Sequence, residues 1–183
     1  MHTFSIRPRR IALVAALALV AAAVALTATA GASGAAVSAA GPLTVYAVPD
    51  NPAAGVEAAV HETVTGNGTT IVTLHLSGFG PSAEGRTFGA HAHVNPCGSV
   101  GTDAGPHYTH PVAAPTLEER EIWLDFTVNP GGEAHAKATR NWTIVPTQFA
   151  PYGARSVIIH ALATSTAGVA GARLACIDVP FEG

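Results

Sequence analysis

Apolar and polar residues alternate in short runs along most of the chain, and Gly, Pro and Asn separate these runs. A period of two is typical of β-strands that bury one face. From residue 43 onward the pattern predicts about seven or eight strands and shows no helical periodicity. The runs are 43–48, 58–64, 70–79, 121–128, 133–144, 155–162 and 172–179, with a further β-like segment at 90–93. We therefore predict an all-β fold, an antiparallel sandwich or flattened barrel.

Two short turn sequences join neighbouring runs. The motif TGNG at 65–68 contains Asn-Gly, the strongest short signal for a β-hairpin, between the second and third runs. The motif NPGG at 129–132 predicts a second hairpin between the runs 121–128 and 133–144. Both turns favour antiparallel pairing of consecutive strands.

The first 30 residues differ from the rest of the chain. Arg7, Arg9 and Arg10 precede the apolar run 11–26, and small residues follow at 28–30. This order is typical of a helical secretory signal peptide that is removed on export. An uncleaved membrane anchor is the alternative, although the run is shorter than the roughly 20 residues of a spanning helix. We expect a signal peptide at 1–30, a flexible Ala/Gly/Ser-rich linker at 31–41 and the β-domain at 42–183.

Charge narrows the range of partners. Three of the nine basic residues lie in the leader, so the remaining chain has six basic against twelve acidic residues, a net charge of −6. No basic patch survives, which argues against nucleic acid and against anionic membrane surfaces once the leader is removed. A small anion remains a feasible partner if a local positive group attracts it.

The chain has two cysteines, Cys97 and Cys176. In an exported protein a pair of cysteines favours one structural disulfide over two free thiols. A bridge would close a loop of roughly 80 residues, which the chain-entropy model values at about 4 to 4.5 kcal/mol.

Four of the nine histidines form a candidate metal site. His91 and His93 are two residues apart in a β-like segment, so both side chains leave one face. His107 follows a Gly-Pro turn that can fold it back over this pair, and His160 ends an apolar run. Several imidazoles without a thiolate suit copper or zinc. By contrast His61, His75 and His135 alternate with apolar neighbours, and we expect them on polar strand faces.

Four sequence blocks carry a specific resemblance. The blocks FGAHAHVNPC at 88–97, AGPHY at 104–108, RSVIIH at 155–160 and GVAGARLACIDV at 168–179 resemble, in order, the signatures of the Cu/Zn superoxide dismutase family. The last block departs from the family pattern at Val169. The resemblance covers residues 43–180 and implies a Greek-key β-sandwich.

The resemblance also implies residue roles. His91, His93 and His160 match copper ligands, and His107 matches the histidine that bridges copper and zinc in zinc-containing members. Cys97 and Cys176 match the intrasubunit disulfide of the family. Arg173 matches an arginine beside the copper that attracts superoxide; without the resemblance it would be a surface ion-pair partner.

The zinc ligands of the family are missing. After His107 the sequence offers only His110 before His135, and a structural zinc site wants four protein ligands. The segment 161–170 is short and lacks charged residues. Both losses resemble the copper-only branch of the family, and we expect copper without zinc. His110 is either a spare ligand or an exposed loop residue.

Without zinc, another group must orient His107. Asp125 and Glu121 share a face of their predicted strand, and either carboxylate can accept a hydrogen bond from a ligand imidazole. We favour Asp125. The sequence thus predicts an exported copper-dependent superoxide dismutase whose substrate is superoxide. A non-catalytic copper-binding or copper-buffering protein is the alternative, and a plain structural domain would not need the four histidines. A cupredoxin would need a cysteine ligand.

Overall fold

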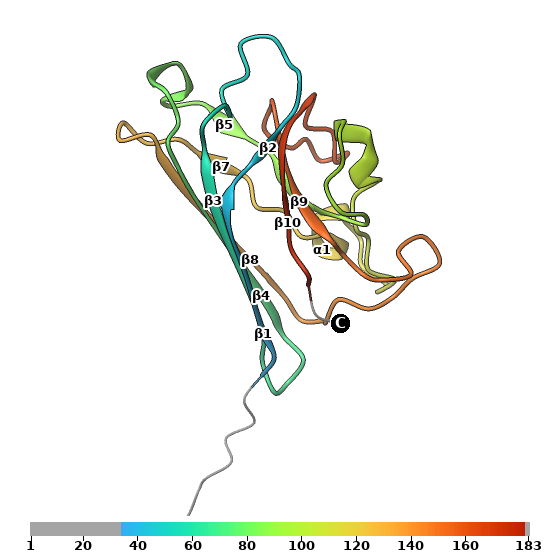
Figure 1. Cartoon of the computed structure of the whole chain (residues 1–183). Coiled ribbons are helices and arrows are strands. Elements are labelled where there is room, and N and C mark those ends of the chain that lie inside the picture. The colour runs from blue at the N-terminus through green and yellow to red at the C-terminus, as the bar shows by residue number, and fades with distance from the viewer. Residues whose placement is uncertain (1–33, 182–183) are drawn as a thin grey trace, which may run out of the picture. The chain divides into compact units, whose positions relative to one another are not determined.

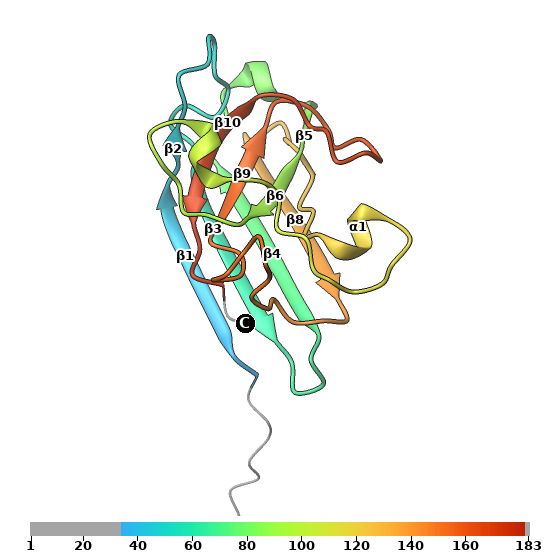
Figure 2. The same cartoon turned by 90° about the vertical axis from the view of Figure 1, so that its right-hand side faces the viewer.

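The computed structural model describes residues 34–181, so the expected signal peptide lies outside the described residues. Two four-stranded antiparallel sheets form the domain, in the strand orders β1-β3-β4-β8 and β2-β10-β9-β6 (Figures 1 and 2). A two-stranded ladder, β5-β7, is added to them. The strands are β1 Ala36–Pro42, β2 Thr44–Val45, β3 Glu57–Val64, β4 Thr70–Ser77, β5 Thr87–Phe88, β6 Ala90–His93, β7 Phe126–Thr127, β8 Glu133–Arg140, β9 Ser156–His160 and β10 Arg173–Asp178.

Between residues 34 and 181, helical structure is confined to three short turns. These are the 3-10 turns η1 Pro81–Ala83 and η2 Gly101–Ala104 and the single α-helical turn α1 Leu117–Arg120. Thr116 and Glu119 form a capping box at the start of α1. The prediction of an all-β sandwich is confirmed. Within residues 34–181 no helix is long and apolar enough to cross a membrane.

The sheet β1-β3-β4-β8 has the alternating pattern that the sequence predicts. In β4, buried and more exposed residues alternate along the strand, and Val72, Leu74 and Leu76 point into the core. The TGNG turn joins β3 and β4 in register, from Glu57 opposite Ser77 to Val64 opposite Thr70. The hairpin prediction for this turn is confirmed. His61, His75 and His135 are exposed on this sheet, as expected.

The expected flexible linker is partly wrong. Residues Ala36–Pro42 form β1, which pairs with β3 along its whole length. Val37 and Ala39 pack against the core, so a run of small residues has one half-buried face. The backbone of β1 supplies hydrogen-bond partners to an edge of β3 that would otherwise stay unpaired. Composition indicated a tether here because small side chains carry little hydrophobic signal.

Two other predicted elements are shorter than expected. The run 43–48 forms only the two-residue strand β2, and the run 121–128 forms only β7. The NPGG turn exists, because Asn129 accepts hydrogen bonds from the backbone of Gly131 and Glu133. The prediction of a hairpin between the two runs that flank this turn is wrong, however, because β7 pairs with β5 and β8 pairs with β4.

In the sheet β2-β10-β9-β6, the strands β6 and β9 are buried on both faces. Every residue of β6 and β9 is buried. Ala90, Ala92, Val157 and Ile159 belong to the main core between the sheets. Their alternating neighbours face the other way, where Ile158 packs against Ala104 of η2. The segments 106–108 and 122–124 are hydrogen-bonded to β6 along the edge that does not pair with β9. This covered outer face, not the core, contains the histidines.

Candidate metal site

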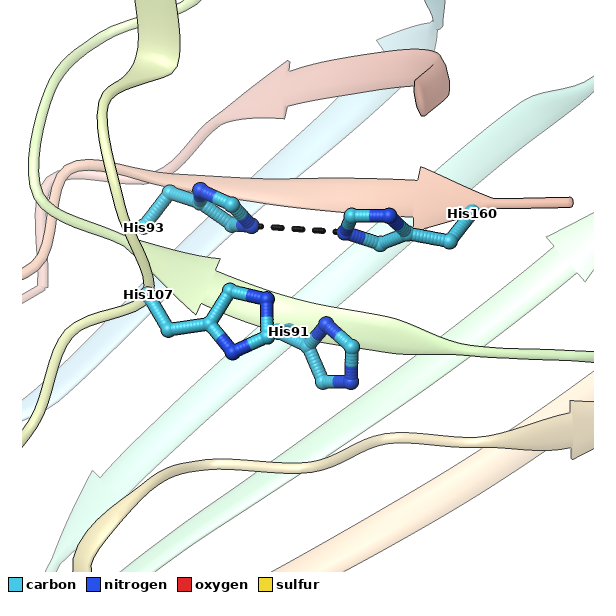
Figure 3. Close-up of side chains that lie close together, drawn as sticks. All are labelled: His91, His93, His107 and His160. Atoms are coloured by element: carbon cyan, nitrogen blue, oxygen red, sulfur yellow. Dashed lines mark hydrogen bonds between the residues drawn. The ribbon is translucent and has the colours of Figure 1, made fainter. Parts of the chain in front are cut away.

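His91 and His93 lie on the covered outer face of β6, as the alternation predicts. His160 comes from the end of β9, which pairs with β6. His107 is brought in by a single antiparallel bridge between its backbone and that of His93. The four rings converge on one point, as Figure 3 shows. One ligand nitrogen from each of the four lies within 4.8 Å of the others.

The second nitrogen of each ring is held from outside. His93 Nδ1 lies 3.0 Å from the carbonyl of Gly105, and His160 Nδ1 lies 3.3 Å from the carbonyl of Gly171. Their Nε2 atoms face each other at 3.4 Å (Figure 3). His107 Nδ1 lies 2.9 Å from Glu121 Oε2. Hydrogen bonds of this kind fix the tautomer and the orientation of metal-ligating histidines.

His91 uses its nitrogens the other way round. Its Nε2 lies 2.7 Å from the hydroxyl of Thr164, and its Nδ1 is buried without a hydrogen-bond partner. An unpaired buried nitrogen is costly unless something else occupies it. Three imidazoles that present Nε2 and one that presents Nδ1 therefore fit a metal ion held at their centre.

Burial keeps three of these rings neutral. It lowers the pKa of His91 and of His93 to about 2 and that of His160 to about 4, and neighbouring positive charge adds to the effect. Arg173 contributes to that charge for all three. A metal ligand must offer a deprotonated nitrogen, so these imidazoles are ready to bind at neutral pH.

Glu121 is the partner of His107, which corrects the preference for Asp125. Glu121 is 4 % exposed and also accepts hydrogen bonds from Trp123 Nε1 at 2.7 Å and Thr109 Oγ1 at 3.1 Å. Burial alone would raise the pKa of its carboxyl, but the hydrogen bonds from His107, Trp123 and Thr109 lower it overall. The segment 121–125 is not a regular strand, so the two carboxylates reach different rings.

Asp125 instead lies on the His91 side of the site. It accepts hydrogen bonds from both the backbone and the hydroxyl of Thr164, and its nearest oxygen is 3.8 Å from His91 Nε2. Sequence reasoning missed Thr164, because a threonine in a short Ala/Thr/Gly loop carries no signal of a role. His110 is not among the converging residues: its ring stacks on Trp142 at 4.4 Å between ring centroids.

Arg173 is held beside the histidines by an irregularity in β10. The register shifts between Arg173 and Ala175, which places Arg173 opposite His160. Bulges of this kind redirect a side chain. Its guanidinium donates to the carbonyls of Gly101 at 2.6 Å and Gly105 at 2.7 Å. The carbonyl of Gly105 thus accepts from both Arg173 and the imidazole of His93.

The disulfide joins Cys97 to Cys176 in β10. It lies in a small apolar cluster with Tyr46, Ala104 and Ile158, on the same covered face as the histidines. The bridge therefore attaches the loop that carries Gly101 and Gly105 to the sheet. A disulfide is compatible with an exported protein.

The fold and the site together define an antiparallel β-sandwich with four close histidines that can hold a metal ion. No family model and no curated protein matches the chain. Among solved structures, the crystal structure of the clock protein EA4 is similar, with a TM-score of 0.53 and 14% sequence identity. The match covers 82% of this chain and 96% of that chain. At this identity the likeness concerns the fold alone.

Proposed function

We propose that the protein is an exported copper-dependent superoxide dismutase that works without zinc. The observation that carries the proposal is the set of four converging imidazoles with Arg173 beside them. Imidazoles without thiolate or carboxylate ligands suit copper in both of its oxidation states. The reaction converts two superoxide ions and two protons into dioxygen and hydrogen peroxide. A bound copper ion would supply the Cu(II)/Cu(I) couple that takes an electron from one superoxide and returns it to the next.

His107 is suited to handling a proton. Its side chain is 17% exposed, whereas that of His91 is fully buried. Glu121 holds the Nδ1 hydrogen of His107, so Nε2 is the atom at which this ring binds the metal or carries a proton towards peroxide. The same contact supports a site without zinc, because the nitrogen that would face a second metal already donates to a buried carboxylate.

Arg173 is suited to attracting the substrate. The chain beyond the leader is acidic overall, so a small anion needs a local positive field. The charge of Arg173 lies close to the site, because its guanidinium and the imidazole of His93 share the carbonyl of Gly105. Two of its five N–H groups serve the Gly101 and Gly105 carbonyls, which leaves donors for an anion.

A non-catalytic copper-binding protein is the second candidate. Both Nη atoms of Arg173 donate to backbone carbonyls, so this residue has a structural role whether or not superoxide binds. This function would use the four histidines and the disulfide in the same way. It differs from the first only in turnover.

The test is to purify the protein, load it with copper, and measure superoxide consumption together with bound copper and bound zinc. We expect one copper ion for each chain, little zinc, and rapid consumption of superoxide. Stoichiometric copper without dismutation would favour the non-catalytic candidate. Tight stoichiometric zinc beside the copper would contradict the copper-only proposal.

A further inference from the structure

His91 is the one member of the site whose outer nitrogen contacts a side-chain hydroxyl. His93 and His160 contact backbone carbonyls, and His107 contacts a carboxylate. A carbonyl or carboxylate oxygen can only accept, so it fixes the position of the ring hydrogen by itself. A hydroxyl can donate or accept. The hydroxyl of Thr164 therefore needs another group to decide which of these it does.

Asp125 fixes the direction in which this hydroxyl donates. The Thr164 hydroxyl donates to Asp125 Oδ1 at 2.6 Å, and the Thr164 backbone N–H donates to Asp125 Oδ2 at 2.7 Å. The hydroxyl has one hydrogen, which is now used. Towards His91 Nε2, at 2.7 Å, it can only accept. His91 must then carry its hydrogen on Nε2 and leave Nδ1 as a free lone pair.

The position of the free lone pair matches the site. His91 Nδ1 is the buried nitrogen that has no hydrogen-bond partner. Direct contact cannot replace the threonine, because the 3.8 Å between Asp125 Oδ1 and His91 Nε2 exceeds a hydrogen bond. The threonine thus links a partly exposed carboxylate to a fully buried ring and fixes the position of the hydrogen on that ring.

The backbone around Gly89 leaves room for this contact. A Cβ at Gly89 would lie 2.7 Å from Thr164 Oγ1, 2.7 Å from Ala170 Cβ and 3.0 Å from the carbonyl of Leu162. The Gly89 N–H also donates to that Leu162 carbonyl at 2.7 Å. The short loop after β9 therefore lies directly against the chain that leads into β6.

We infer that Thr164 is a positioning residue, whose hydroxyl, oriented by Asp125, fixes His91 in the tautomer that presents Nδ1 to the metal. This inference rests on the copper site of the proposed function and not on turnover. The loop after β9 then contributes to the site although it has no charged residue. The loop holds a ligand in place by relaying a hydrogen bond.

The first test uses the metal-free protein, in which nitrogen-15 NMR of the histidines reports the tautomer of His91. We expect the hydrogen on Nε2 in the parent protein and a mixture of tautomers in Thr164→Val, which keeps the shape and loses the hydroxyl. Thr164→Ser should restore the parent tautomer. A parent protein with the hydrogen on Nδ1 would overturn the inference without the need for any variant.

The second test is a competition titration with Cu(II) and a chelator, followed by electron paramagnetic resonance of the bound Cu(II). Loss of such an outer partner weakens metal binding by about 10- to 100-fold in other sites, and we expect this for Thr164→Val. Thr164→Ser should bind nearly as the parent does, and the exposed Thr166→Val is the matched control. Parent-like affinity and spectrum in Thr164→Val would overturn the inference. Copper bound normally without dismutation would leave it standing and count only against the proposed enzyme.

Discussion

The two sheets of the sandwich use histidine in opposite ways. On the sheet β1-β3-β4-β8, His75 and His135 lie opposite each other, with ring centroids 6.3 Å apart, and both are exposed. On the other sheet, His91 and His93 are completely buried. The two strand types look alike in local sequence, because each places histidine between small or apolar residues. The two sets differ because loops bury His91 and His93 and leave His75 and His135 exposed. The strand pattern alone does not show this difference.

The largest expected effect comes from removing a buried ligand. His93→Ala deletes one of the four converging nitrogens, and we expect copper affinity to fall by more than the roughly 100-fold that an outer partner can cost. His75→Ala on the exposed sheet is the matched control and should keep one tightly bound copper ion. Copper retained after dialysis against a chelator measures both. Equal loss in the two variants would refute the distinction between the sheets.

Mild acid should destabilise the metal-free protein. The pKa values of His91 and His93 are about 2 and that of His160 is about 4 in the folded protein, against 6.5 in the unfolded chain. The unfolded state therefore binds more protons below pH 6.5, and stability falls as the pH falls. Each ring contributes up to about 1.4 kcal/mol per pH unit.

Denaturant unfolding at pH 7 and at pH 5 measures this effect. Copper binds best to the deprotonated imidazoles that the folded protein brings together, so the copper-loaded form is the control and should stay more stable at both pH values. A metal-free protein equally stable at pH 7 and pH 5 would contradict the assignment of buried neutral rings.

Glu121→Gln should weaken the site to an intermediate extent. It removes the negative charge that His107 Nδ1 meets at 2.9 Å while keeping the shape of the side chain. We expect about a 10-fold loss, at the lower end of the range for outer partners, in copper affinity or in turnover. The exposed Glu118→Gln is the matched control. If both variants behave as the parent does, Glu121 does not orient His107.

Arg173→Lys should have the smallest effect. Lysine keeps the positive charge but cannot donate in a fork to the Gly101 and Gly105 carbonyls. We expect copper binding to remain and superoxide consumption to fall several-fold, because lysine lacks the forked donors with which arginine can hold a small anion. Steady-state consumption measured at low and high salt tests this. A parent-like rate at both salt concentrations would show that the forked donors of Arg173 are not needed for substrate capture.

Sequence reasoning reached the sandwich and the four histidines because both depend on local regularities. Alternation predicts strands, and the spacing of His91 and His93 places them on one face. The residues around the site depend instead on the paths of irregular loops. Glu121 and Asp125 have the same chemistry and lie four residues apart on one predicted strand, so only the structure distinguishes their partners. Thr164 has no sequence signal, and β1 was hidden because its small side chains carry little hydrophobic signal.

The disulfide bears on the order in which the protein matures. Cys97 and Cys176 connect β10 to the loop whose carbonyls at Gly101 and Gly105 hold Arg173 and His93. Until the two thiols are oxidised, that loop has one fewer attachment to the sheet, and the carbonyls are less firmly placed. Metal uptake should therefore be most efficient after oxidation. In a chain kept reduced, the carbonyls that hold Arg173 and His93 would stay less firmly placed and the metal site would be incomplete.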